Sequence, residues 1–286
     1  MKRILCILMI LMLAPGFALA NDYDSGVMMA STESGSLVKL VTGMGVPGNP
    51  ELSRGDIVAI RFQSSLFNAP DSAWDMSAAG DRSVLGWTEE TPEGLRLVIA
   101  ALGGVRANED SSSLFAYYTH LLRIDFDNSF DTSGVTNMNR MFANCHDLRT
   151  LDVRQLNTSN VTDMAYMFAN CFQLYSLDLR SFDTSRVTDM SGMFHSSYNL
   201  ASLNLSGLDT KNVEDLHVMF DFCRSLTSLD LTSFDTRRVT DMGGMFLLCD
   251  SLREVRVSSN FVKPDSFWKT FDMFVGCGAK ELTYVN

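Results

Sequence analysis

Cysteine is the residue type in this sequence whose spacing most directly suggests chemistry. Four cysteines occupy one position of a 26-residue period, and Ser197 fills the rung that lacks one. The four are Cys145, Cys171, Cys223 and Cys249, with Cys277 beyond them. The column could be a metal or redox ladder, or could form disulfides between Cys145 and Cys171 and between Cys223 and Cys249.

Two observations favour a simpler interpretation of this column. No CxxC pair and no histidine at a matching spacing accompanies it, so we expect no metal site and no cofactor. A disulfide needs Cα atoms about 4.4–6.8 Å apart, and helices on the outer side of a curved repeat stack usually stand further apart. We therefore expect buried, unpaired thiols that face the core.

An acidic row shares the 26-residue period. Its members each lie between two apolar residues of a short alternating segment, and they are Asp125, Asp152, Asp178, Asn204 and Asp230. Like charges on neighbouring strands repel by roughly 1 kcal/mol per close pair. Either the row is an acidic stripe for a basic ligand or a cation, or Arg154 and Arg180, two residues further along, neutralise it.

We favour neutralisation, and we expect this outward face to be the ligand-binding surface. Its candidate site residues are Asp152, Asp178, Asp230, Arg154 and Arg180.

The remaining motifs give weaker signals. Arg54-Gly55-Asp56 matches the tripeptide that host integrins recognise, but so short a motif occurs by chance and can simply start a strand. The histidines are scattered, with no nucleophile elbow and no phosphate loop; they are His120, His146, His195 and His217. We therefore expect no catalytic residues and no enzymatic activity. A glycosidase-like carboxylate pair stays open as an alternative, although nothing singles one out.

The period itself must position all these residues. Leucines recur every 26 residues from Leu148 to Leu252, and phenylalanines do so from Phe142 to Phe246. Residues 121–251 therefore divide into five units of 26–27 residues, the first of which carries one extra residue. A repeat of this length is typical of a solenoid, in which each unit buries its apolar side against its neighbours.

Within a unit the hydrophobic period changes. Leu151-Asp152-Val153 alternates, which predicts a short strand with one buried face. Apolar residues then follow at spacings of three and four, which predicts one face of a helix; in this unit they are Val161, Met164, Met167, Phe168, Cys171 and Leu174. The expected fold class is α/β, a leucine-rich-repeat solenoid with parallel strands on one face and short helices on the other. A β-helix without helices is the alternative, but the Met-x-x-Met-Phe-x-x-Cys spacing favours a helical turn.

The continuation Phe-Asp-Thr-Ser-x-Val-Thr-Asp-Met-x-x-Met-Phe-x-x-Cys closely resembles the BspA-like leucine-rich-repeat surface proteins. Residues 182–194 and 234–249 carry it most fully, and the resemblance covers about residues 70–277. It implies a secreted or surface-located repeat protein, often regarded as an adhesin, with no enzymatic activity. One departure is that the turn asparagine of typical leucine-rich repeats is missing. We expect a threonine column to replace it: Thr132, Thr158, Thr184, Thr210 and Thr236.

The sequence outside the repeats divides into four further segments. Residues 1–20 have the basic start, apolar run and Ala18-Leu19-Ala20 ending of a cleaved signal peptide. Residues 21–69 form a leader of uncertain structure. Residues 70–120, with Trp74 and Trp87, are expected to cap the first coil. Residues 252–286 are expected to close the other end, because they are rich in aromatic and other apolar residues, namely Phe267, Trp268, Phe271, Met273 and Phe274.

The net charge and the expected export limit the classes of binding partner that this protein can have. Loss of the signal peptide lowers the formal net charge from −11 to −13, which argues against nucleic acid and anionic membranes as direct partners. We expect no integral membrane segment after cleavage, and a protein that is secreted, held at the cell surface or periplasmic. The leading hypothesis is binding of a protein or glycan ligand, of host origin or from another cell. An extracellular or periplasmic scaffold is the rival, and a hydrolase the distant third.

Overall fold

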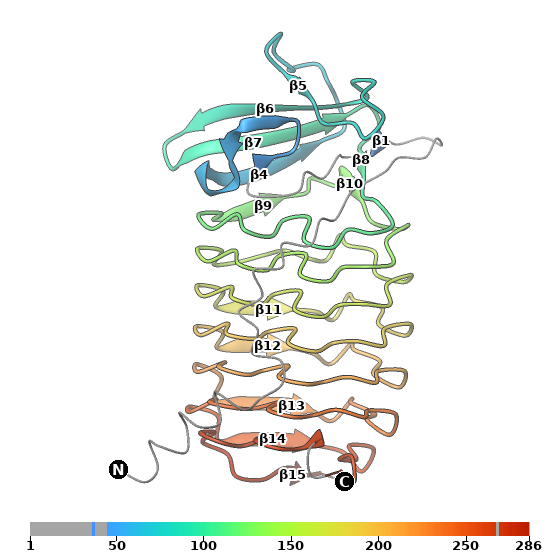
Figure 1. The fold of residues 1–286 in the computed structure, drawn as a ribbon, viewed down its shortest axis with the longest axis vertical. Coiled ribbons are helices and arrows are strands. Elements are labelled where there is room, and N and C mark those ends of the chain that lie inside the picture. The colour runs from blue at the N-terminus through green and yellow to red at the C-terminus, as the bar shows by residue number, and fades with distance from the viewer. Residues whose placement is uncertain (1–35, 38–44, 267–268, 286) are drawn as a thin grey trace.

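The structure is a computed structural model that describes residues 36–37, 45–266 and 269–285. It is an elongated stack of coils with a larger sheet at its N-terminal end (Figure 1). The expected signal peptide, most of the leader before Gly45, and Phe267 and Trp268 of the expected C-terminal cap lie outside the described residues. Among the described residues, no helix has the length and apolar character needed to cross a membrane.

A five-stranded sheet covers the first coil. Its strands, in spatial order, are β5 (Trp74–Asp75), β6 (Val84–Thr91), β7 (Gly94–Ala101), β4 (Ile57–Gln63) and β9 (Arg123–Asp125). The β6–β7 pair is antiparallel, whereas β4 pairs in parallel with both β7 and β9. Because β9 belongs to the first coil, the sheet runs directly into the stack and shields the apolar end of the solenoid from water.

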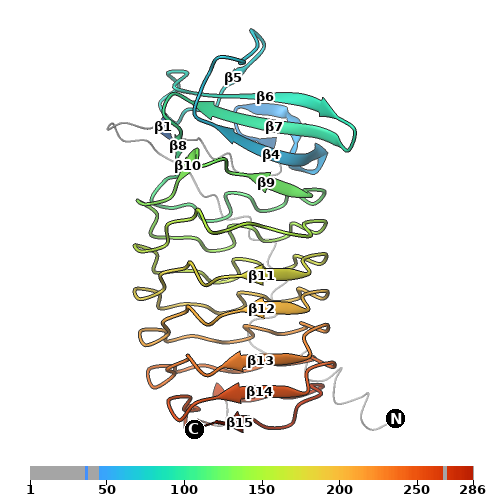
Figure 2. The same cartoon turned by 180° about the vertical axis from the view of Figure 1, so that it is seen from behind.

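Shorter strands complete the fold. The antiparallel pair β2 (Gly45–Val46) and β3 (Asn49–Ser53) precedes β4, and three two-residue strands pair in parallel in the order β1 (Ser36–Leu37), β8 (Val105–Arg106) and β10 (Phe130–Asp131). One face of the stack carries parallel strands from successive coils (Figures 1 and 2), which are β11 (Ser176–Asp178), β12 (Ser202–Asn204), β13 (Ser228–Leu231), β14 (Glu254–Val257) and β15 (Thr283–Tyr284). β11 pairs with β12, and β14 pairs with both β13 and β15.

The predicted helices are absent, so the α/β leucine-rich-repeat fold is wrong. The described residues contain no α-helix, and their helical structure consists of short 3₁₀ turns such as η1 (Arg54–Asp56). The segment that follows the strand in each coil, from Val161 to Leu174 in one unit, is a series of turns. The alternative that we ranked lower, a β-helix without helical segments, is closer to the observed structure.

Hydrogen bonding explains why this segment is not helical. The N–H groups of Met164, Tyr166 and Phe168 donate to carbonyl oxygens of the next coil, at 2.8–3.0 Å. The intervening N–H group of Met167 closes a β-turn onto the carbonyl oxygen of Met164 at 3.2 Å. A helix would direct all these donors back into its own segment, and the coils would lose the bonds that join them.

Backbone dihedral angles give the same result. Tyr166 and Asn170 have φ angles of 56° and 58°, in the left-handed region that ends a right-handed helix. In the next coil Gly192 takes the first of these positions, and a Cβ atom there would lie 2.3 Å from the ring of Tyr166. The spacing of three and four therefore comes from consecutive turns, each of which returns an apolar side chain to the core.

The core is built from identical columns, as the sequence predicted. Phe142, Phe168, Phe194 and Phe220 are fully buried, and their rings stack on each other with centroids 5.5–5.8 Å apart. The stack continues through Phe246 to Phe274 in the C-terminal segment, at 5.3 Å. Methionines of the same segments are equally buried, which confirms that both columns are core.

The threonine column satisfies the turn backbone, and this prediction is confirmed. Thr184 Oγ1 accepts the N–H of Asp209 at 2.8 Å and donates to the carbonyl oxygen of the same residue at 2.9 Å. Thr158 and Thr210 make the same pair of bonds to the next coil, and all three are buried. Each threonine hydroxyl therefore replaces a water molecule or a turn asparagine between two coils.

Candidate functional site

The predicted strand-face residues do point outward. Asp152, Asp178 and Asp230 are exposed, and each lies beside an apolar residue that is buried. Each carboxylate also has a local structural role, because its Oδ1 accepts the N–H of the residue two positions on, at 3.0–3.1 Å. Asn204 makes the same bond to Ser206 at 3.2 Å. These four positions of the row therefore form Asx turns, which explains why they hold only Asp and Asn.

Two arginines neutralise aspartates of the row, each within its own coil. Arg154 Nε and Nη2 donate to the two carboxylate oxygens of Asp152, at 2.9 and 2.6 Å. Arg180 forks onto Asp178 in the same way, with Nη2 2.7 Å from Oδ2. The Arg154 hydrogen bond is the largest cause that lowers the pKa of Asp152, and Arg180 acts likewise on Asp178. Both acids therefore stay ionised, and the predicted neutralisation is confirmed.

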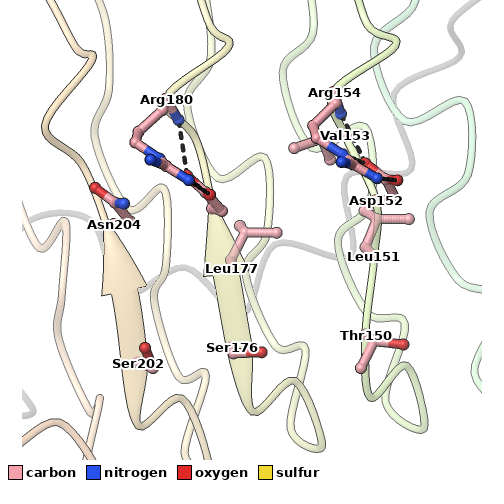
Figure 3. Close-up of a pocket in the computed structure, with 11 residues that line it drawn as sticks. Thr150, Leu151, Asp152, Val153, Arg154, Ser176, Leu177, Arg180, Ser202 and Asn204 are labelled. Atoms are coloured by element: carbon pink, nitrogen blue, oxygen red, sulfur yellow. Dashed lines mark hydrogen bonds and ion pairs between the residues drawn. The ribbon is translucent and has the colours of Figure 1, made fainter.

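These two pairs line a shallow hollow of about 550 Å³ on the strand face. Figure 3 shows Arg154 folded back over Asp152, with Arg180 and Asn204 at the same height on the neighbouring strands. Hydroxyl groups of Thr150, Ser176 and Ser202 form its lower row. The structure thus brings together four of the five predicted site residues, whereas Asp230 does not line the hollow and instead lies 3.5 Å from Arg256.

A second hollow, of about 350 Å³, was not predicted from the sequence. It involves residues that precede the strands in the same coils, and these are Arg149, Gln173, Tyr175, Asn199, Ala201 and Ser225. Tyr175 is 62% exposed. The residues vary between units and therefore stand outside the repeated motif. Positions that vary from repeat to repeat while the rest of the motif is constant are the sequence signal by which these residues could have been identified.

A second cluster that sequence reasoning missed lies in the turn segment. His195 Nδ1 is 3.1 Å from Oδ2 of Asp221 in the next coil, and His195 Nε2 is 3.2 Å from Oγ of Ser196. Asp221 is only 4% exposed, and this burial raises the pKa of its carboxyl. In other coils the equivalent positions, 143 and 169, hold alanines. The repeat pattern therefore gives no sign that His195 and Asp221 form a pair.

The connectivity Ser–His–Asp is that of a nucleophilic triad, but the surroundings do not support acyl transfer. Ser196 is 6% exposed, so a substrate carbonyl cannot reach its Oγ without movement of the coil. The Ser196 N–H, an obvious oxyanion donor, is already bonded to the carbonyl oxygen of Asp221 at 2.8 Å. We interpret the cluster as a polar contact that joins two coils.

The cysteines form the predicted buried column. All five described cysteines are free and buried. Cys171 Sγ donates to the carbonyl oxygen of Phe142 at 3.2 Å, and Ser197 Oγ makes the equivalent bond to Phe168 at 2.8 Å. Burial raises the pKa of Cys171 to about 12, which keeps the thiol protonated. In the described residues no group of three or more His, Cys, Asp or Glu could hold a metal ion.

The Arg-Gly-Asp tripeptide is structural. Arg54 is 3% exposed, its guanidinium donates to the carbonyl oxygens of Ser113 and Ala116 at 3.2 and 2.7 Å, and it lies over the ring of Tyr118. Asp56 accepts the N–H of Ser53 and caps η1. An integrin would need the arginine in solvent, and here that arginine joins the N-terminal sheet to the first coil.

Comparison with known protein families agrees with the repeat. The family described as "Mycoplasma protein of unknown function, DUF285" matches residues 109–202 and again residues 173–281. The chain belongs to the DUF285 family. The two matches together cover more than half of its length and include both hollows. No curated protein and no solved structure matches the chain significantly.

Proposed function

We propose that this DUF285 protein is a secreted or surface-associated binding protein that recognises a protein or glycan ligand through its strand face. The hollow between Arg154 and Arg180 carries the proposal, because it places fixed charges and hydroxyl groups together on a rigid surface. The match to this repeat family and the resemblance to BspA-like surface proteins, which carry such domains, support it. The apolar run and Ala18-Leu19-Ala20 of residues 1–20 support export.

The preformed arginine forks support binding more than catalysis. Each guanidinium is held by its own aspartate, so little conformational entropy is lost when a ligand engages it. The stack is also rigid on this face, because the strands are hydrogen-bonded from coil to coil. No catalytic step is needed to account for these features, and we propose none.

The test is binding of the purified chain to an array of extracellular-matrix proteins and glycans. For any ligand found, Arg154→Gln with Arg180→Gln should weaken binding at least about tenfold, as loss of charge-assisted hydrogen bonds does. The triple variant Asp152→Asn, Asp178→Asn, Asp230→Asn should also weaken binding if the ligand contacts the carboxylate charges. Asparagine keeps the turn bonds, so this variant changes the charge without changing the turns.

A matched control is Arg237→Gln. Arg237 forks onto Asp235 in the same way, with Nη2 2.5 Å from Oδ2, but it lies outside both hollows. Equal loss in this control would reject the strand-face site. Absence of binding across the whole array would move weight to the rival function, a scaffolding repeat protein.

A further inference from the structure

The second hollow differs in chemistry from its neighbour. Arg149 is the only charged residue that lines it, and among the described residues Arg149 has no ion pair. Arg154 and Arg180, by contrast, are each neutralised by an aspartate. A guanidinium without an ion pair can bind an anion locally, and its planar fork suits a carboxylate.

The aromatic ring of this hollow is uncovered. In the adjacent column, His146, Phe172 and Tyr198 stack on each other at 4.5 and 5.1 Å, so their faces are occupied. Tyr175 makes no ring contact of this kind within the described residues, and Ala201 occupies the next rung beside it. One face of a large exposed ring is therefore available for a flat, partly apolar ligand.

Two amide groups complete the hollow. Asn199 Nδ2 donates to Gln173 Oε1 at 3.4 Å, which links the side chains of neighbouring coils. Gln173 and Asn199 are both exposed, and no further hydrogen bond to protein occupies Gln173 Nε2 or Asn199 Oδ1 in the part of the chain that the structure describes. One remaining donor and one remaining acceptor on two linked amides suit the hydroxyl groups of a sugar.

We propose that this hollow binds a carboxylated sugar residue of an acidic oligosaccharide. The sugar's C–H face stacks on Tyr175, its adjacent hydroxyls bond Gln173 and Asn199, and its carboxylate bonds Arg149. The first hollow lies on the same three coils, which contain Leu151, Leu177 and Ser202. The hydroxyl groups that line the first hollow would bind the next sugar residues of the glycan. The inference rests on the proposed function, because it names the ligand class of the same face.

The test uses calorimetric titration of the full purified chain with three kinds of probe. The first is a sialylated oligosaccharide, the second an oligouronate, and the third the same sugars with the carboxyl group reduced to an alcohol. We expect saturable binding of at least one acidic probe and binding about 10- to 100-fold weaker after reduction, since a charge-assisted pair is lost. The first two probes distinguish the two sources of the carboxylate.

Variants assign the roles within the hollow. Arg149→Gln should abolish the preference for the acidic probe over its reduced form, whereas Tyr175→Ala should weaken both forms. Tyr284→Ala is the control for an exposed tyrosine outside the hollow, because Tyr284 is 58% exposed at the C-terminal end. Retention of the preference in Arg149→Gln would overturn the assignment.

The outcomes also separate this inference from the proposed function. If no acidic oligosaccharide binds while a protein ligand is lost on Arg154→Gln with Arg180→Gln, the glycan inference fails and the strand-face function stands. If nothing binds the chain at all, both fail. If acidic sugars bind but Tyr175→Ala has no effect, the hollow is not the site and the inference is wrong.

Discussion

Two acidic columns of this solenoid use the same local bond in opposite surroundings. On the strand face, Asp152 and Asp178 accept the N–H two residues further on. In the turn segment, Asn137, Asp163 and Asp215 accept it in the same way, at 2.7–2.8 Å, and consecutive members pair in parallel from coil to coil. Both columns are first of all turn-forming positions.

Their electrostatics differ because their solvent exposure differs. The strand-face acids are exposed and paired with arginines, so the pKa of each lies below its usual value. Burial is the largest cause that raises the pKa of Asp163 and Asp215, and the neighbouring Asp189 adds repulsion. The comparison shows that a repeated aspartate does not by itself mark a binding site. The strand-face column leaves its carboxylates exposed to solvent, whereas those of the turn column are partly buried.

The largest expected effect on stability comes from the threonine hydrogen bonds that join neighbouring coils. Thr184→Val keeps the shape of the side chain but leaves the N–H and carbonyl groups of Asp209 without their partner. We expect the free energy of unfolding to fall by about 2–4 kcal/mol, as for two unsatisfied buried groups. Urea denaturation measures it. Thr188→Val, at an exposed position, is the control and should change stability by less than about 0.5 kcal/mol. Equal losses would show that buried and exposed columns do not differ.

A smaller effect of opposite sign is expected in the turn column. Asp163→Asn preserves the acceptor for the N–H of Ala165 and removes a charge that burial and Asp189 disfavour. Asn137 already occupies the same position one coil earlier. We expect the free energy of unfolding at pH 7 to rise by about 1 kcal/mol. A loss of stability instead would mean that the Asp163 charge has a stabilising partner.

The pH dependence should separate the two columns. The pKa of Asp163 is raised in the folded state, so its ionisation disfavours folding at neutral pH, and this penalty disappears as the pH falls through the raised pKa to below 3.8. The gain from Asp163→Asn should therefore vanish in acid. The pKa of Asp152 is lowered, so its contribution to stability is present above pH 3.8 and is lost as the pH falls through the lowered pKa. Urea denaturation of Asp163→Asn and of Asp152→Asn between pH 7 and pH 3 tests these two trends. A gain in stability from Asp163→Asn that does not change with pH would contradict them.

The smallest expected effect is on the strand face. Asp152→Asn keeps the acceptor for the Arg154 N–H and loses an exposed ion pair, so the free energy of unfolding at pH 7 should change by no more than about 0.5 kcal/mol. Asp152→Ala, which also loses the turn bond, should cost about 1 kcal/mol. If the asparagine variant were as destabilising as the alanine variant, the exposed ion pair would matter more than the turn.

The sequence predicted the columns well and the backbone poorly. Burial of Phe168 and Cys171, exposure of Asp152 and the bridging role of Thr184 all follow from residue type and period. The helix was wrong because a spacing of three and four describes which side chains face inward, and consecutive turns produce it as well as a helix does. One signal was present: Asn170 and Gly192 occupy positions with positive φ, which these residue types favour.

The sequence by itself therefore determined the period, the residues that face the core and the residues that face solvent. The tertiary structure alone decided where the backbone donors go, because each N–H group of the turn segment can bond within its coil or to the next one. It also decided which non-repeating residues meet. His195 contacts Asp221, and Tyr175 lies beside Arg149, because stacking places positions 26 residues apart side by side. Such contacts depend on the spatial register between coils, which hydrogen bonds between the coils set.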